Sequence, residues 1–152
     1  GIMYNHESPR RGYQFVTRKI STTVAKIHLG LADRLELGNI DALRDWGYAP
    51  DYVVAMHAML QLDKPEDFVI STGLLHTVKD FLIEAFSVVG LEYEPYTHIN
   101  PDHFRPGETI PLCGDSRKAR ELLDWKPTIS FEQVVKEMVL TDIDYFKKMK
   151  RI

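Results

Sequence analysis

The sequence predicts an α/β fold, and two patterns support this. Short apolar runs, typical of buried strands, alternate along the chain with stretches whose apolar residues recur at helical spacing. The resulting order is strand, helix, strand, helix, strand, helix, strand, a long loop and two helices, as expected of an α/β domain. A chain of 152 residues with 44% hydrophobic and 27% charged residues can bury its own core. We therefore expect a globular chain of ordinary domain size.

In the first half of the chain, glycine and proline mark the ends of helices. Gly30 is well placed to end one helix in a left-handed conformation, and Pro50 suits the first turn of the next. The segment 44–48, Arg-Asp-Trp-Gly-Tyr, follows neither the helical nor the strand period, so we expect it to be irregular. The predicted elements of this half are a strand over 1–5, a helix over 14–29, a strand over 34–37, a helix over 50–62 and a strand over 68–70.

In the second half, capping motifs mark where helices begin. Thr77 with Asp80, and Ser130 with Gln133, have the three-residue spacing of a capping box, and Asp115 can cap a further helix. Residues 91–113 hold four prolines and several aromatic or charged groups, which favours a short strand and then a long ordered loop. The predicted elements are a helix from 78 to near 90, a strand over 91–94, a loop to 113, and helices over 116–123 and 131–148.

Net charge and cysteine content limit the classes of partner and setting. The formal net charge of -3 offers no basic field to a nucleic-acid backbone, so nucleic acid is not an expected partner. The single cysteine, Cys113, excludes an internal disulfide, favours a reducing cytoplasmic setting and is expected to be a small buried thiol. No secretion leader is visible, and no apolar run approaches the roughly 20 residues of a membrane span. We expect no membrane partner.

Two motifs that would hold a metal or a nucleotide are weak or absent. His98 and His103 flank Asp102, but this spacing fits no zinc pattern, so we expect no metal site. No Gly-x-Gly-x-x-Gly follows any predicted strand. A glycine-rich loop that cradles a cofactor's phosphates is therefore not expected in this sequence.

Arginine stands beside aromatic residues in three charged segments, which are the opening loop, 44–46 and 104–108. Because a guanidinium binds phosphate oxygens in pairs and a neighbouring ring can stack on a base, these segments indicate a nucleotide-sugar site with two distant arginines on one diphosphate. The alternative is that each arginine is a surface residue or pairs with its own neighbour, Asp45 or Glu108. His6 could act as a general acid or base, but we favour a hydrogen-bond donor.

The most specific motif is the opening run 5–12, Asn-His-Glu-Ser-Pro-Arg-Arg-Gly. Further motifs are Phe-Val-Thr-Arg-Lys-Ile at 15–20, Leu-Gly-Asn at 37–39, Arg-Asp-Trp-Gly at 44–47, Pro-Glu-Asp-Phe-Val-Ile at 65–70, Phe-Arg-Pro at 104–106, Gly-Asp at 114–115 and Trp-Lys-Pro at 125–127. Together they resemble the carboxyl-terminal half of the GDP-mannose 4,6-dehydratase family. The likeness runs in order along nearly the whole chain, although shorter pieces such as Arg-Asp-Trp recur across extended short-chain dehydrogenases that act on sugar nucleotides.

The resemblance implies the substrate-binding part of a Rossmann-type extended short-chain dehydrogenase, with the main nucleotide-binding sheet mostly missing. Residues 1–13 would be the last strand and loop of the cofactor domain, and 14–152 a mixed α/β substrate-binding domain with carboxyl-terminal helices. In the family, the residues matching His6 and Arg11 contact NADP. The residues that the resemblance places at GDP-mannose are Asn5, Val16, Lys19, Gly38, Arg44, Arg105 and Glu108, with Arg44 and Arg105 approaching its diphosphate.

The family reaction converts GDP-mannose to GDP-4-keto-6-deoxymannose by NADP-dependent internal redox and water elimination, a step towards GDP-fucose. The family's glycine-rich loop, Thr-Glu pair and Tyr-x-x-x-Lys motif lie upstream of Gly1, so we expect no catalytic residue here and no activity without the amino-terminal cofactor domain. The parent enzyme would be a homodimer or homotetramer. Family members usually carry a longer insertion where this chain has only 95–103.

Two other readings of the same residues stay open. A GDP-sugar reductase or epimerase would share the two arginines that face a diphosphate, but it need not share the opening run. A noncatalytic nucleotide-sugar-binding module would keep the binding residues and lack a cofactor domain altogether.

Overall fold

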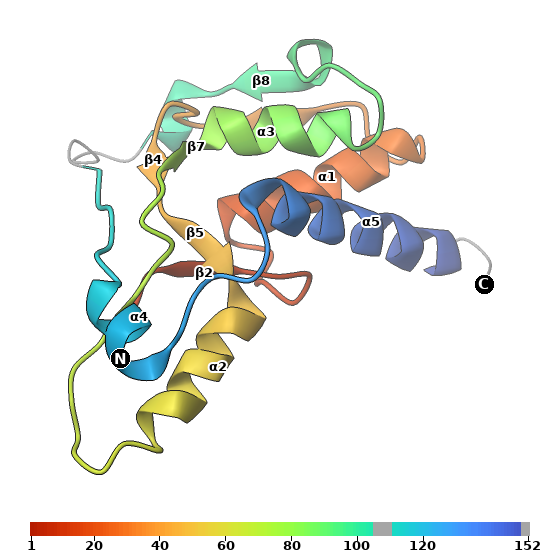
Figure 1. The fold of residues 1–152 in the computed structure, drawn as a ribbon. Helices are drawn as coiled ribbons and strands as arrows, with labels where there is room; N and C mark the ends of the chain where they lie inside the picture. Colours follow the sequence, from red (N-terminus) through yellow and green to blue (C-terminus); the bar gives the residue numbers. More distant parts are fainter. Residues whose placement is uncertain (105–110, 150–152) are drawn as a thin grey trace.

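The computed structural model describes residues 1–104 and 111–149 and confirms the α/β class (Figure 1). The helices are α1 (Val16–His28), α2 (Ala49–Met59), α3 (Val78–Ser87), α4 (Arg117–Leu123) and α5 (Phe131–Met149), with 3-10 turns η1 (Glu94–Tyr96) and η2 (Pro101–His103). The strands are β1 (Ile2–Met3), β2 (Asn5–Glu7), β3 (Leu35–Leu37), β4 (Leu43–Arg44), β5 (Trp46–Tyr48), β6 (Val69–Ile70), β7 (His76–Thr77) and β8 (Thr97–Ile99). No helix among the described residues is long and apolar enough to cross a membrane.

The described strands pair two by two. Three pairs are parallel, namely β1 with β6, β2 with β5 and β3 with β8, whereas β4 and β7 are antiparallel. Each pair joins segments far apart in sequence, so these strand pairs depend on long-range contacts rather than on hairpins.

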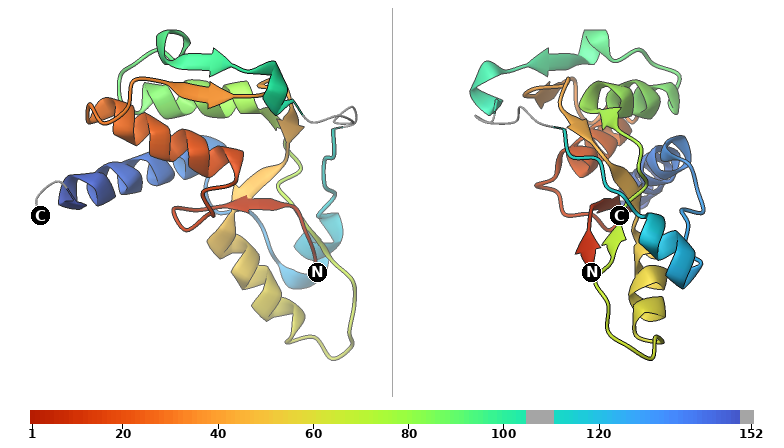
Figure 2. Two further views of the ribbon diagram at one scale, coloured as in Figure 1. Left: turned by 180° about the vertical axis from the view of Figure 1, so that it is seen from behind. Right: turned by 60° about the vertical axis from the view of Figure 1, so that its left-hand side comes forward.

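One core cluster lies where α1, α3 and α5 pack on each other (Figure 1). Figure 2 shows the same three helices from behind, with β3 and β8 along the outer side of this layer. Apolar residues at helical spacing on α1, among them Ile20, Val24 and Ile27, are buried here, as the sequence predicts.

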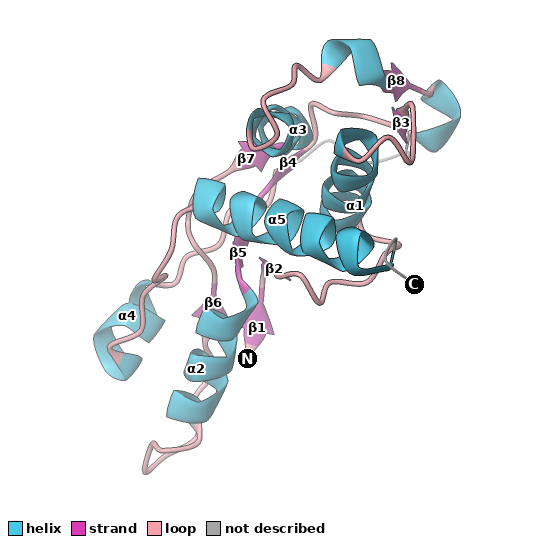
Figure 3. Cartoon of the chain, turned by 90° about the vertical axis from the view of Figure 1, so that its right-hand side faces the viewer, coloured by secondary structure: helices cyan, strands magenta, loops and turns pink. Residues whose placement is uncertain are grey.

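A second core cluster lies between α2, β6 and α4. Figure 3 shows these elements below the layer formed by α1, α3 and α5. Its largest buried side chains are Tyr52, Phe68 and Trp125. The Asp51 carbonyl accepts a hydrogen bond from the Trp125 indole at 2.7 Å, which fixes the segment between α4 and α5 on α2.

The opening segment connects the two clusters. β1 pairs with β6 in the second cluster, and β2, one residue later, pairs with β5, which packs against α5 and leads directly into α2. The loop after β2 then enters α1. Polar residues of the opening run therefore lie where the two parts of the fold meet.

Most predicted elements are confirmed to within a few residues. The five helices are present, and α3 begins with the predicted capping box, in which Thr77 Oγ1 accepts from the Asp80 N–H and the Asp80 carboxylate accepts from the Thr77 N–H. The second predicted box also forms, because Ser130 and Gln133 exchange the same two hydrogen bonds ahead of α5.

Three local predictions are wrong. No strand forms at 91–94, where η1 begins at Glu94, and the strand lies instead at Thr97–Ile99, which pair with β3. Segment 44–48 holds the last residue of β4 and all of β5, because β7 and β2 supply partners that local periodicity cannot reveal. Cys113 is exposed instead of buried.

Candidate functional site

A cavity of about 520 Å³ lies where β2, the start of α1, the end of β3 and strands β4 and β5 come together. This volume falls in the range typical of small-ligand sites. Its walls mix apolar side chains such as Val16 and Trp46 with charged ones. The opening run, the start of α1 and the segment from 37 to 46 thus meet around one space.

The structure brings most of the sequence-predicted site residues to this cavity. The predicted residues that line it are Asn5, Arg11, Val16, Lys19, Gly38 and Arg44. They come from five separate elements or loops, so their meeting depends on the tertiary fold. Arg105 and Glu108 lie outside the described residues.

His6 does not line the cavity. Its Nδ1 lies 2.8 Å from the Tyr4 carbonyl oxygen, and its ring stacks on Tyr52 with the centroids 4.8 Å apart. This agrees with a donor and not with a general base aimed at the cavity. Because the neighbouring residues of β2 point to opposite faces, Asn5 and Glu7 reach the cavity and His6 does not.

Arg11 is held on two sides. Its Nε lies 3.3 Å from Oε2 of Glu7, and its guanidinium carbon lies 3.6 Å from the centroid of the Phe15 ring. The same Glu7 oxygen accepts a hydrogen bond of 2.5 Å from the Thr17 hydroxyl. The loop between β2 and α1 is therefore closed at its base by a carboxylate, a guanidinium and a hydroxyl.

Glu7 is buried, with 1% of its surface exposed, and burial raises the pKa of its carboxyl above the usual range. The hydrogen bond from Thr17 and the charges of Arg11 and His6 oppose this rise by favouring the ionised form. The ionised form of Glu7 therefore depends on these neighbouring groups, because burial alone would disfavour its charge.

The charged groups around the cavity favour an anionic ligand. Among the described lining residues, Arg11, Lys19 and Arg44 carry positive charge, whereas Glu7 is negative. Arg44 also donates from Nη1 to the Leu43 carbonyl at 2.7 Å. Three cations from three separate segments against one carboxylate leave an excess of positive charge, which suits phosphate oxygens.

A buried ionic contact fixes α1, which carries Val16 and Lys19. Arg18 pairs with Asp142 of α5, and the Ser21 hydroxyl donates to the same carboxylate at 2.8 Å. The first turns of α1 are therefore held against α5 on the side away from the cavity.

Gly38 meets the backbone of η2 closely. A Cβ at this position would lie 2.5 Å from the carbonyl oxygen of His103 and 2.8 Å from its carbonyl carbon. Neither atom belongs to a side chain that can turn away, so only glycine lets the two segments approach in this way. Gly38 and His103 both line the cavity.

The sequence left open that Arg44 pairs with its neighbour Asp45, but the contacts of Asp45 lie elsewhere. Its buried carboxylate accepts hydrogen bonds from the N–H groups of Thr72, Gly73 and Gly114 and from the Thr72 hydroxyl. Asp45 thus organises two loops near the second core cluster.

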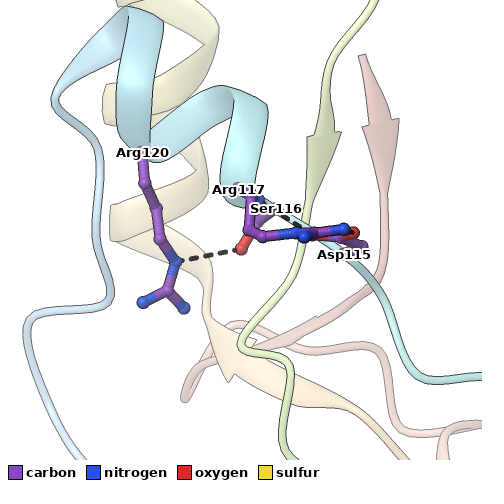
Figure 4. A network of polar contacts seen from close by, with 4 residues as sticks. All are labelled: Asp115, Ser116, Arg117 and Arg120. Atoms are coloured by element: carbon purple, nitrogen blue, oxygen red, sulfur yellow. Dashed lines mark hydrogen bonds and ion pairs between the residues drawn. The ribbon is translucent and has the colours of Figure 1, made fainter.

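The start of α4 carries a separate polar network, shown in Figure 4. Asp115 pairs with Arg117 at 2.6 Å, and Arg120 Nε donates to Ser116 Oγ. The N-cap residue is Ser116, so the predicted cap at Asp115 is one residue early, although Asp115 still accepts from the Arg117 N–H. These residues do not line the cavity and have a structural role.

Several cavity residues were not predicted as site residues. They are Glu7, Gln14, Phe15, Thr17, Leu37, Asn39, Ala42, Trp46, Val78 and His103. Glu7 had one available signal, because it lies four residues before Arg11 in a polar run. Nothing local marks His103, which reaches the cavity only because η2 folds back on Gly38.

The fold is that of part of a Rossmann-type extended short-chain dehydrogenase. The fold matches RMD from Pseudomonas aeruginosa, solved with NADPH, with a TM-score of 0.85 and 21% identity over 94% of this chain and 47% of the other. It also matches UDP-glucose 4-epimerase from Thermotoga maritima, solved with UDP-glucose, with a TM-score of 0.77 and 25% identity over 97% and 45%.

The chain belongs to the GDP-mannose 4,6 dehydratase family, whose family model matches residues 1–138. It is 51% identical over 150 residues to GDP-mannose 4,6 dehydratase 1 of Arabidopsis thaliana, covering 99% of this chain and 42% of that protein. It is 46% identical over 164 residues to GDP-mannose 4,6 dehydratase of Homo sapiens, covering 97% and 44%. The chain therefore spans less than half the length of these relatives.

The relatives differ in length within the matched region. The plant alignment runs over 150 positions and covers 99% of this 152-residue chain, which leaves no room for an insertion of several residues. The human alignment runs over 164 positions, more than the whole chain, so it must contain gaps. The absence of an extra segment is thus a feature that this chain shares with the plant relative.

Proposed function

We propose that this chain is the substrate-binding portion of an NADP-dependent GDP-mannose 4,6-dehydratase, a hydro-lyase that forms GDP-4-keto-6-deoxymannose and water. The observation that carries the proposal is the meeting of six residues, matched to ligand contacts by family motifs, around one cavity. These residues are Asn5, Arg11, Val16, Lys19, Gly38 and Arg44. The proposed roles of Arg105 and Glu108 at the same ligand rest on the motif alone.

Charge supports a diphosphate ligand. Lys19 lies on α1 and Arg44 at the end of β4, and both line the cavity. A diphosphate placed between these elements would meet cations from two directions, which satisfies more of its oxygens than a single residue can. An uncharged sugar could accept hydrogen bonds from these residues but would gain no charge complementarity.

NADP is the proposed cofactor, and Arg11 fits an anionic part of it. The Arg11 guanidinium is stacked on Phe15 with only its Nε turned to Glu7, so its terminal nitrogens can meet a phosphate or other acceptor. His6 can contact the cofactor only through Nε2, because Nδ1 is hydrogen-bonded to the Tyr4 carbonyl oxygen. When bound, NADP supplies hydride exchange, whereas this chain's residues bind and orient the two ligands.

The groups that move protons are proposed to lie in the part of the relatives that this chain does not span. An amino-terminal cofactor domain would then be a required partner, and residues 1–13 would belong to it. Exposed apolar side chains on α2 and at its C-cap support such a partner, since Val53 and Met56 of the helix and the C-cap Leu60 are 61%, 41% and 82% exposed at helical spacing. We further propose a cytoplasmic homodimer or homotetramer for the complete enzyme.

Ligand binding to the chain tests the proposal directly. Isothermal titration should detect GDP-mannose and show weaker binding of UDP-glucose, which keeps the diphosphate but changes the base and the sugar. Equal or tighter binding of UDP-glucose would favour an epimerase-type specificity, and no binding of either would contradict the proposal. Dehydratase turnover by this chain alone would show that the catalytic groups lie within it.

A further inference from the structure

Glu7 is the one acidic side chain among the described residues that line the cavity, and it occupies an unusual position there. It is buried and comes at the end of β2, so neither solubility nor an exposed ion pair explains it. A single oxygen, Oε2, faces both the Thr17 hydroxyl at 2.5 Å and the Arg11 Nε at 3.3 Å. Glu7 therefore touches the two segments that carry the cavity's ligand-facing groups.

The contacts of Arg11 define the orientation of its guanidinium. Because the group is planar, its contact with the Phe15 ring, 3.6 Å from the centroid, limits how the plane can tilt. The Glu7 carboxylate, whose Oε2 lies 3.3 Å from the buried Nε, attracts that edge of the guanidinium by its charge, although the Nε–H makes no hydrogen bond. Among the described contacts, Glu7 pairs with Nε alone, and neither terminal nitrogen of Arg11 makes an ion pair or hydrogen bond with that carboxylate.

We propose that Glu7 is a positioning residue that holds the Arg11 guanidinium so that its terminal nitrogens face an anionic ligand in the cavity. Without Glu7, the Arg11 side chain would be more flexible within the loop between β2 and α1, and the entropy lost on ordering it would weaken ligand binding. Because Glu7 orders Arg11 in the folded protein before the ligand arrives, ligand binding itself loses less side-chain entropy. The inference rests on the proposed function only in that the ligand is a phosphate-bearing nucleotide.

A purely structural role for Glu7 makes a different prediction. Thr17 needs only a hydrogen-bond acceptor at position 7, and the amide oxygen of glutamine can supply it. The ion pair to Arg11, in contrast, needs the negative charge. Glu7→Gln thus keeps the size and the acceptor for Thr17 while it removes the charge that orients Arg11.

A double-mutant cycle separates the two roles. Glu7→Gln should leave the unfolding midpoint near that of the wild type and weaken binding of GDP-mannose or NADPH, whichever ligand Arg11 contacts, by about tenfold. Arg11→Gln should weaken the same ligand at least as much. The double variant should bind it like Arg11→Gln alone, because Glu7 acts only through Arg11.

Thr17→Val is the matched control, because it removes the other bond to the same Glu7 oxygen and leaves the Glu7 charge in place. Because Thr17 also lines the cavity, the readout is additivity: the affinity losses of Thr17→Val and Arg11→Gln should add, since Thr17→Val keeps the charge that orients Arg11. Equal affinities for wild type and Glu7→Gln, or additive losses in the double variant of Glu7 and Arg11, would overturn the inference.

A ligand-free measurement makes the outcome independent of the proposed function. By nitrogen-15 relaxation, the Arg11 Nε–H bond vector should be well ordered in the wild type and mobile in Glu7→Gln. If this difference is present but neither GDP-mannose nor NADPH binds the wild type, the positioning role stands and the proposed function fails. If the Nε–H bond vector is equally ordered in both proteins, the positioning role is wrong.

Discussion

Arg18 and Asp142 form a buried ion pair that joins α1 to α5, with 2.5 Å between Arg18 Nη1 and Asp142 Oδ1. Ser21 adds a hydrogen bond to the other carboxylate oxygen. Burial raises the pKa of Asp142 above its usual value, while Ser21 and Arg18 oppose the rise. Burying the pair costs desolvation free energy. Each group nevertheless stabilises the other, because neither charge can reach water.

Asp142→Ala should destabilise the fold by about 3–5 kcal/mol, because it leaves the Arg18 charge buried without its partner. Urea unfolding followed by circular dichroism measures this loss. Asp144→Ala, on the exposed side of the same helix, should change stability by no more than about 0.5 kcal/mol. Equal effects of the two substitutions would contradict the role given to the buried pair.

The capping box of α3 should make part of the stability dependent on pH. The hydrogen bond from the Thr77 backbone lowers the pKa of Asp80 below its usual value. A lowered folded pKa means that this contribution is present above the unfolded pKa of about 4 and is lost as pH falls through the folded value. Asp80→Asn should therefore reduce stability at neutral pH and have little effect in acid.

Thr77→Ala removes the other half of the box and should cost about 1 kcal/mol at neutral pH. Unfolding curves of wild type, Thr77→Ala and Asp80→Asn at neutral and acidic pH would test both statements. If the gap between wild type and Asp80→Asn widened in acid, the direction of the Asp80 shift would be wrong.

The parts of the fold that sequence predicted are those whose information is local. Apolar spacing between Val16 and Ile27 defines a helix, and a Thr with an Asp three residues later defines its start in α3. β4, β5 and β8 hold only two or three residues each, too few to show a period. Their strand conformation comes from partners such as β2 and β3, which are distant in sequence.

The candidate site follows the same division. Family motifs identified Arg11, Lys19 and Arg44, whose side chains reach the cavity. Glu7 was missed because a glutamate in a polar run reads as an exposed residue, and only the fold shows that it is buried. His103 enters the site through its backbone contact with Gly38, which no side-chain pattern encodes.

Asp51 should be essential for holding the 125–128 segment on α2. Its carboxylate accepts from the Thr128 N–H at 2.9 Å and from the Thr128 hydroxyl at 2.6 Å. Asp51→Ala leaves the backbone donor without this acceptor and should cost about 2–3 kcal/mol, whereas Thr128→Val removes one bond and should cost about 1 kcal/mol. Chemical unfolding measures both. Asp63→Ala, at an exposed position, is the control, and a loss of similar size there would argue against a specific contact.

Gly38→Ala should separate β3 from η2 and weaken the site. The new Cβ would lie 2.5 Å from the His103 carbonyl oxygen, so the backbone of one segment must move. This movement would disturb the hydrogen bond of 2.7 Å from the Asn100 N–H to the Leu37 carbonyl, at the end of the β3–β8 pair.

We expect Gly38→Ala to lower stability by about 1–3 kcal/mol, as overpacking does, and to weaken GDP-mannose binding severalfold. Gly12→Ala is the matched control, because the atoms that its Cβ would meet belong to the end of the Gln14 side chain, which can turn aside. Its stability should stay within about 0.5 kcal/mol of the wild type. Calorimetric unfolding and titration with GDP-mannose compare the two variants. If Gly38→Ala matched Gly12→Ala in both measurements, the close approach of His103 to Gly38 would not shape the cavity.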